Sequence, residues 1–273
     1  MPELPEVETV CRGIEQNILG KRIISVQTSG KNLRLPFPDN ITDLEDQKII
    51  SVVRRARYIL IKTNKDQILL IHLGMSGKLI YLQHFPEQLN KHDHFAVQFS
   101  DDSCLIYNDP RRFGLVDLVN VDKIDQHKMI KNLGPEPLTK NFNAKYLQQQ
   151  LKGKKINIKT AMMDNAIVVG VGNIYINESL FESKILPLKA AGNLGLKQLE
   201  VLIKNIKNIL QKAISSGGST LRDYVQSNGD VGNFQFDFKV YGKDGQNCVV
   251  CSSKIKRIKQ NGRSSFYCDS CQV

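Results

Sequence analysis

Apolar residues near the start of the chain recur with the spacing of one helix face. Acidic residues stand in the first turn, where they complement the positive end of a helix dipole. The pattern predicts an amphipathic helix that begins near residue 3 and ends near Gly20. Its apolar face is formed by Val7, Val10, Cys11, Ile14 and Ile18.

Between residues 21 and 121 the helical spacing gives way to short β-branched and aliphatic runs with turns between them. Runs of this length and spacing are typical of an antiparallel sandwich or a flattened barrel. The sequence therefore predicts an all-β region of about eight strands. These strands are expected at 22–27, 48–53, 58–62, 67–72, 78–82, 95–99, 104–107 and 115–119.

The residues Asn-Leu-Gly-Pro-Glu-Pro at 132–137 have the glycine and proline content of a hinge. Helical spacing returns after the hinge, at 144–151, 174–183 and 196–214. Residues 215–233 are rich in Ser, Gly and Asn, and their length fits either a linker or a mobile functional loop.

We therefore expect an α+β chain with two domains and a small C-terminal module. The first domain, residues 1–131, combines the N-terminal helix with an eight-stranded β-sandwich. The second domain, residues 138–234, is helical and includes the 215–233 segment. The C-terminal module spans residues 239–273 and contains four closely spaced cysteines.

Charge adds a class of partner to this picture. The 273 residues include 38 Lys and Arg against 27 Asp and Glu, a formal net charge of +11. The excess is concentrated at 54–57, 152–159 and 239–273. Any one such cluster is explained by a solvated surface, but three together favour a nucleic-acid partner.

Composition excludes several other classes. With 41% hydrophobic residues the chain can bury a core, which argues against intrinsic disorder. No run of 18 apolar residues predicts a membrane helix, and the N-terminus does not resemble a signal peptide. We expect a soluble, cytoplasmic protein with no membrane partner.

The C-terminal cysteines have the spacing of a zinc ribbon. Two C-x2-C pairs are separated by 16 residues, as in a site where two hairpin turns each supply two thiolates. Two disulfides are the alternative, but a chain without a secretion signal is expected in a reducing compartment. We predict one structural zinc, which would hold 239–273 as a rigid basic finger. Its ligands would be Cys248, Cys251, Cys268 and Cys271.

Two further cysteines and the N-terminal residues remain. Cys11 and Cys104 lie in apolar patterns and are expected to be buried rather than nucleophilic. Removal of Met1 would expose a secondary amine at Pro2, beside the carboxyl of Glu3. An α-amino group is partly unprotonated near neutral pH, so Pro2 could attack a sugar carbon and Glu3 could transfer protons. The alternative is an ordinary proline at a helix start.

Motifs along the whole chain resemble the formamidopyrimidine-DNA glycosylases. The resemblance spans about 270 residues, and its most specific parts are the N-terminus and the zinc ribbon. The matching segments are Met-Pro-Glu-Leu-Pro-Glu-Val-Glu-Thr at 1–9, His-Leu-Gly-Met-Ser-Gly at 72–77, Lys-His-Asp-His at 91–94, Asp-Pro-Arg-Arg-Phe-Gly at 109–114, 133–137, Met-Asp-Asn at 163–165, Gly-Val-Gly-Asn-Ile-Tyr at 170–175, and Tyr-Gly at 241–242 with the ribbon.

The resemblance implies an enzyme of base-excision repair. It would remove 8-oxoguanine and formamidopyrimidines and then cut the strand by β- and δ-elimination. Pro2 would be the Schiff-base nucleophile, Glu3 the proton donor, and Glu6 a supporting residue. The partner would be double-stranded DNA with an oxidised purine or abasic site, bound by a monomer at the nucleoid of a bacterial cytoplasm.

The resemblance also implies which side chains contact DNA. Met75, Arg111 and Phe113 would fill the gap left by a flipped nucleotide, which suits a flexible apolar wedge, a fork of donors and an aromatic ring. From the sequence alone, a core position is the favoured interpretation of Met75 and Phe113 and a surface charge is the plain interpretation of Arg111, and only the motif match reverses this. The residues matching phosphate contacts are His92, Lys154, Lys159, Asn173 and Arg263.

One position departs from the family pattern. Arg57 stands where the family usually has a lysine credited with proton donation or base positioning during β-elimination. A guanidinium stays charged and is a poor proton donor, so elimination or lesion ranking should be altered. The same reservation applies to Arg263, which matches the δ-elimination residue.

The resemblance implies that the helical domain carries a helix-turn-helix-like element. It also implies that 215–233 would fold over the extruded base, with Ser219, Thr220 and Tyr224 as unassigned polar contacts.

Two other functions compete with this one. An endonuclease VIII type enzyme for oxidised pyrimidines is one rival, although that group typically continues Gly-Pro-Glu after Pro-Glu. A non-catalytic DNA-binding protein is the other, and it would not need Pro2 and Glu3.

Overall fold

The computed structural model describes residues 1–219 and 232–273, which divide into two compact units. The first unit contains Met1–Lys131 together with 216–219 and 232–233, and the second contains Asn132–Ser215 and Phe234–Val273. Thr220 and Tyr224 lie outside the described residues. Among the described residues, no helix is long and apolar enough to span a membrane.

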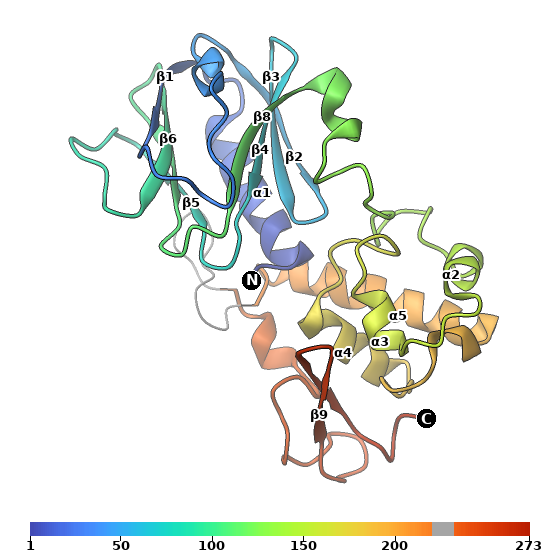
Figure 1. The fold of residues 1–273 in the computed structure, drawn as a ribbon. Coiled ribbons are helices and arrows are strands. Elements are labelled where there is room, and N and C mark those ends of the chain that lie inside the picture. The colour runs from blue at the N-terminus through green and yellow to red at the C-terminus, as the bar shows by residue number, and fades with distance from the viewer. Residues whose placement is uncertain (220–231) are drawn as a thin grey trace. The chain divides into compact units, whose positions relative to one another are not determined.

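In its described residues the first unit is a β-sandwich with one α-helix, α1 (Leu4–Ile18). Two antiparallel four-stranded sheets have the orders β1-β6-β7-β5 and β2-β3-β4-β8 (Figure 1). The prediction of an N-terminal helix and eight strands is therefore confirmed. The strands are β1 (Ile23–Thr28), β2 (Ile49–Arg55), β3 (Tyr58–Thr63), β4 (Gln67–His72), β5 (Lys78–Leu82), β6 (Asp93–Phe99), β7 (Cys104–Asn108) and β8 (Leu115–Asn120), with short 3-10 helices η1 (Ile41–Leu44) and η2 (Val121–Gln126).

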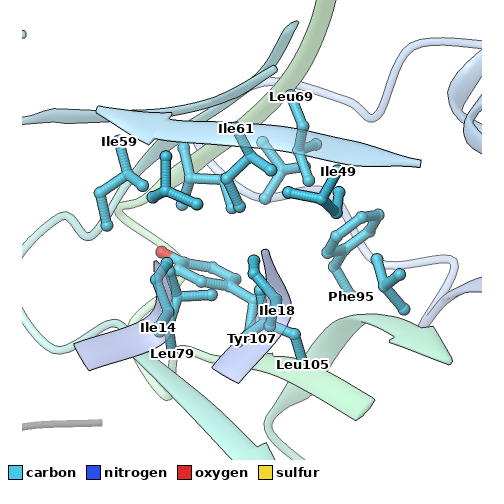
Figure 2. Close-up of a cluster of buried hydrophobic side chains, with 14 of the residues drawn as sticks. Ile14, Ile18, Ile49, Ile59, Ile61, Leu69, Leu79, Phe95, Leu105 and Tyr107 are labelled. Atoms are coloured by element: carbon cyan, nitrogen blue, oxygen red, sulfur yellow. The ribbon is translucent and has the colours of Figure 1, made fainter. Parts of the chain in front are cut away.

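The core of this unit lies between the two sheets. Figure 2 shows Ile59 and Ile61 of one sheet facing Leu79 and Tyr107 of the other. The apolar stripe of α1 enters the same core and contacts β2, β3 and β5. Tyr107 is fully buried, and its hydroxyl therefore needs a partner inside the protein. That hydroxyl reaches the loops that carry the candidate DNA-contacting residues, where it contacts the His72 carbonyl and the Asp109 carboxylate.

The second unit packs four α-helices around a separate core. Its longest helix contacts two of the others through an apolar stripe, as the helical spacing of the sequence predicted. Asn143 and Asn157 cap two helix starts by accepting backbone N–H groups. The helices are α2 (Ala144–Leu151), α3 (Ile158–Met162), α4 (Asn173–Glu182) and α5 (Leu196–Ser215), with 3-10 turns η3 (Ala191–Asn193) and η4 (Phe234–Asp237). The sequence did not predict α3.

The chain ends in a hairpin of β9 (Lys256–Gln260) and β10 (Arg263–Tyr267). Asn261 and Gly262 connect the strands with φ of 45° and 75°, the positive values of a type I′ turn. This turn places Arg263, an exposed side chain, at the first position of the returning strand.

Buried polar side chains attach the C-terminal hairpin to the helices. Glu178 on α4 accepts three backbone N–H groups, from Lys239, Val240 and Tyr241, at 2.8–3.0 Å. Burial raises the pKa of Glu178, and the three donors oppose that shift. The neighbouring Asn177 accepts the backbone N–H of Phe266 at 2.8 Å. The same short helix therefore fixes both the segment leading into the hairpin and one of its strands.

Candidate active site and nucleic-acid interface

The start of α1 is organised by two glutamates. Glu3 is the N-cap residue, and its side chain accepts the backbone N–H of Glu6. In return, Glu6 Oε2 accepts the backbone N–H of Glu3 at 2.9 Å. This reciprocal capping box satisfies helix N–H groups that would otherwise lack partners. Both glutamates are buried: Glu3 is 6% exposed and Glu6 is 2% exposed. Pro2 precedes them and is half-buried.

Glu6 also holds a residue from far along the chain. Its Oε1 accepts the backbone N–H of Ser219 at 2.9 Å and the Ser219 hydroxyl at 3.0 Å. The last described residue before 220–231 is therefore anchored directly beneath the N-terminus of α1. Sequence reasoning named Ser219 only as an unassigned polar residue and missed this contact, because 213 positions separate the partners.

Arg57 is brought to the same N-terminus by a second pair of contacts. Arg54, only 8% exposed in its side chain, pairs with Glu8 of α1 at 2.9 Å and also donates to the carbonyl of Ala56 at 3.1 Å. This pair fixes the β2–β3 turn against the helix. Arg57 Nη1 then lies 3.8 Å from the sulfur of Met1. The structure thus gathers Pro2, Glu3, Glu6 and Arg57, which the sequence lists as catalytic candidates.

The three wedge candidates lie on two loops of the first unit. Met75 is 39% exposed and Phe113 is 50% exposed, which excludes the alternative that they are core residues. The Arg111 guanidinium carbon lies 4.8 Å from the centre of the Phe113 ring, a cation–π distance. His92 is half-buried on a neighbouring turn.

Three of the residues predicted to contact phosphate lie in the second unit and have a polar group that is exposed or makes no hydrogen bond to a described residue. Lys154 and Arg263 are exposed. Asn173 is the first residue of α4, after Gly172 as the N-cap, and its Oδ1 is buried with no hydrogen-bond partner among the described residues. The N-terminal end of a helix is suited to receiving a phosphate, because the helix dipole favours negative charge there.

Lys159, which was predicted to contact phosphate, is buried in the second unit. The residue is only 1% exposed, and its ammonium donates to the Ser264 carbonyl at 2.8 Å and the Ser265 hydroxyl at 2.7 Å. A buried ammonium with such partners is not accessible to a DNA backbone. Lys159 instead attaches β10 of the hairpin to α3, so the prediction that it grips phosphate directly is wrong.

His72 ends β4 beside the wedge loops and is held neutral. Burial lowers the pKa of His72 to about 4, and Arg57 and Arg34 add to that shift while Asp109 opposes it. Its Nδ1 accepts the backbone N–H of Gly74 at 3.0 Å, which requires the neutral ring. The ring also packs against Tyr58, with centroids 5.0 Å apart.

The four C-terminal cysteines fit a zinc ion. Their sulfur atoms all lie within 4.8 Å of one another, with 3.9 Å between Cys248 and Cys271 and 3.4 Å between Cys251 and Cys268. A tetrahedral site with Zn–S bonds of about 2.3 Å requires sulfurs about 3.8 Å apart. Hydrogen bonds from Ser253 lower the pKa of Cys251 to about 6, whereas the hydrogen bond with Cys251 raises the pKa of Cys271 to about 12. Four thiolates this close need a bound cation to balance their charge.

The other two cysteines are core residues, as predicted. Cys11 is 4% exposed and Cys104 is fully buried. Burial raises the pKa of both thiols, so neither supplies a thiolate nucleophile.

Removing zinc should disrupt the C-terminal hairpin while the β-sandwich stays folded. Cys251→Ser should lower the metal content below one zinc per chain and lower the unfolding temperature of the second unit, because the ion replaces repulsion between thiolates. Elemental analysis and calorimetry measure both effects. Cys104→Ala is the matched control and should retain the metal. Full zinc content in Cys251→Ser would contradict the four-thiolate site.

Acidification should weaken the first unit through His72. Its folded pKa of about 4 lies below the unfolded value of 6.5, so between these values the unfolded chain binds more protons and stability falls as pH falls. At about 1.4 kcal/mol per unit, the full effect is roughly 3 kcal/mol. Urea unfolding of the parent and His72→Gln from pH 7 to pH 4 should therefore show a shallower pH slope for the variant. Parallel profiles would refute the assignment.

Comparisons with known families cover nearly the whole chain. Residues 1–116 match the formamidopyrimidine-DNA glycosylase N-terminal domain, and residues 133–225 match the formamidopyrimidine-DNA glycosylase H2TH domain. Residues 245–273 match a zinc finger found in FPG and IleRS. The last match agrees with the cysteine geometry, and the chain carries one structural zinc site.

Full-length relatives agree with the domain matches. Proteins named formamidopyrimidine-DNA glycosylase from Wolbachia sp. subsp. Drosophila simulans and Zymomonas mobilis are 48% and 45% identical, each over 273 residues and 100% of both chains. A Lactococcus lactis FPG mutant solved with Fapy-dG containing DNA is 36% identical over 99% of each chain, with a TM-score of 0.91. A MutM structure with carbocyclic 8-oxo-G containing DNA has 36% identity over 99% of each chain and a TM-score of 0.89. The chain belongs to the formamidopyrimidine-DNA glycosylase family.

Proposed function

We propose that the chain excises oxidised purines, 8-oxoguanine and formamidopyrimidines, from double-stranded DNA and then cleaves the strand as an AP lyase. The observation that carries this proposal is the cluster at the start of α1, where buried Glu3 and Glu6 lie beside Pro2 and Arg57 adjoins Met1. Relatives with DNA containing Fapy-dG, carbocyclic 8-oxo-G or an abasic site support the substrate class.

The chemistry begins at the nitrogen of Pro2 once Met1 has been removed. Its lone pair forms a bond to C1′ of the damaged nucleotide as the bond from C1′ to the base breaks, and the departing base takes up the proton that the Pro2 nitrogen loses. Opening of the sugar ring, with a proton supplied to the ring oxygen by Glu3, leaves an iminium between Pro2 and C1′. Loss of a C2′ proton then expels the 3′ phosphate, and a second elimination expels the 5′ phosphate.

The buried environment of Glu3 suits this role. The Glu3 side chain is fixed by the capping box and cannot turn away into solvent. Glu6 is committed to the backbone of Glu3 and to Ser219, so it acts by positioning. Positioned groups of this kind lower the barrier because little reorganisation is needed during the reaction.

Access to C1′ requires the damaged nucleotide to leave the duplex. Flipping costs a few kcal/mol in lost stacking and pairing. Exposed Met75, Arg111 and Phe113 would enter the vacated space, with Arg111 donating to the orphaned base. Lys154, Asn173, Arg263 and His92 would hold phosphates and position the duplex without reading its sequence.

The proposed setting follows from the substrate. We propose that the protein acts as a monomer on the chromosome in a bacterial cytoplasm. The sequence predicted domains at 1–131, 138–234 and 239–273 with a hinge at 132–137, whereas the structure groups 216–219 and 232–233 with the first unit. The segment 215–233 is proposed to cover the extruded base, and Ser219 within it is held by Glu6. The relatives named above are bacterial.

Borohydride trapping should give a covalent adduct at Pro2. Protein without Met1 and otherwise identical protein that retains Met1 are incubated with an 8-oxoguanine duplex and reductant. Only the first should be trapped, because the second has an unreactive amide at the Pro2 nitrogen. Peptide mapping locates the adduct. Equal trapping of both forms, or an adduct on a lysine, would refute the proposed nucleophile, and binding without trapping would favour a non-catalytic DNA-binding protein.

A pyrimidine lesion belongs in the same assay. A Lactococcus lactis relative, 35% identical with a TM-score of 0.89, was solved with DNA containing an oxidised pyrimidine. We expect faster excision of 8-oxoguanine than of an oxidised pyrimidine from matched duplexes. The reverse order would favour the pyrimidine-excising rival.

Arg57→Lys should change strand cleavage more than base excision. A lysine can lose a proton to the reacting sugar, whereas the guanidinium stays charged. We expect β-elimination at a preformed abasic site to accelerate by about tenfold, a fraction of the usual contribution of general acid–base catalysis. Arg55→Lys, which makes the same change at the end of β2, is the control. Unchanged rates on 8-oxoguanine, formamidopyrimidine and abasic substrates would contradict this role of position 57.

A further inference from the structure

The two loops that carry the wedge candidates are in direct backbone contact. Gly74 has φ of +62°, and a Cβ atom there would lie 2.6 Å from the backbone of Phe113 and Gly114. A Cβ on Gly114 would lie 1.6 Å from the Tyr107 hydroxyl, and one on Gly77 would lie 2.5 Å from it. Side chains are thus excluded where the loops at 73–77 and 109–114 meet.

One buried carboxylate joins these loops. Asp109 is fully buried. Its Oδ1 accepts a hydrogen bond of 2.6 Å from the hydroxyl of Ser76, which lies on the same loop as Met75. Its Oδ2 accepts the backbone N–H of Gly114 at 2.9 Å and lies 3.3 Å from the Tyr107 hydroxyl. Hydrogen bonds to a carboxylate are stronger than hydrogen bonds between neutral groups. A carboxylate buried away from water is costly unless hydrogen bonds of this kind replace its hydration.

The backbone of Asp109 extends the connection. Its N–H donates to the carbonyl of His92 at 2.9 Å, and its carbonyl accepts the N–H of Arg112 at 3.1 Å. Arg112 has φ of 55°, a left-handed turn between Arg111 and Phe113. The turn leaves the Arg111 guanidinium over the Phe113 ring.

We propose that Asp109 is a positioning residue that makes Met75, Arg111 and Phe113 one rigid wedge. The proposal rests on the function proposed above and deepens it. Because both loops are tied to one carboxylate, insertion of the apolar wedge and approach of Arg111 to the orphaned base occur together. Ordering both loops before DNA binds removes an entropic cost from base flipping.

Two variants test the wedge with the whole chain. Asp109→Asn keeps the shape but loses the charge, and Ser76→Ala removes only the link to the Met75 loop. Both should slow single-turnover excision of 8-oxoguanine by roughly tenfold to a hundredfold, the scale of one lost hydrogen bond to a charged group. Cleavage of a preformed abasic site in single-stranded DNA should stay within about twofold of the parent, because no opposite base must be displaced.

A coupling measurement separates positioning from general destabilisation. Excision rates of Met75→Ala, Arg111→Ala and the double variant are compared in the parent and in the Ser76→Ala background. The two substitutions should be non-additive in the parent and additive when the loops are unlinked. Ile23→Val, a buried change in β1, is the stability control and should preserve the non-additivity.

Each outcome has a distinct meaning. If the parent excises the lesion but Ser76→Ala and Asp109→Asn match it, or if coupling persists without the Ser76 link, the rigid wedge is refuted. If the parent binds lesion DNA and never excises, the proposed function itself fails. Loss of single-stranded cleavage in proportion to excision would also refute the wedge, because the effect would then lie at the N-terminal site.

Discussion

The buried carboxylate of Glu6 is the contact on which the candidate active site depends. One oxygen accepts the N–H of Glu3, and the other accepts both donors of Ser219. A carboxylate at the first turn of a helix is also favoured by the helix dipole. The interaction therefore fixes the backbone that follows Pro2 and holds Ser219, the last described residue before 220–231, with a single side chain.

In the second unit, too, buried polar side chains hold the backbone in place and are not exposed to bind a partner. Glu178, Asn177 and Lys159 each contact the backbone of the C-terminal segment. Removing any one partner would leave a buried polar group unsatisfied, at a cost larger than the bond itself contributes. The zinc site stabilises the end of the same hairpin where β10 leads into Cys268. The orientation of the hairpin on α3 and α4 is set instead by these hydrogen bonds.

Local patterns predicted most of the secondary structure. Helical spacing identified α1 and α5, alternating short runs identified the eight strands, and the cysteine spacing identified the zinc site. The helix α3 was missed because five residues show no period. Lys159 could not be placed from sequence, since a lysine in a basic run looks solvated until the fold buries it. Asp109 was given no role of its own from the sequence, because its partner Ser76 lies 33 positions away.

The burial of Lys159 changes how the charge of the protein should be counted. An ammonium enclosed by Ser264 and Ser265 has no ion atmosphere to exchange with a phosphate. It therefore contributes nothing to the counterion release that makes DNA affinity depend on salt concentration. Lys154 and Arg263 are exposed and are the cations proposed to contact phosphate in the second unit. The steepness with which added salt weakens DNA binding is set by the cations that contact phosphate, and neither the net charge nor a count of lysines in the sequence gives that number.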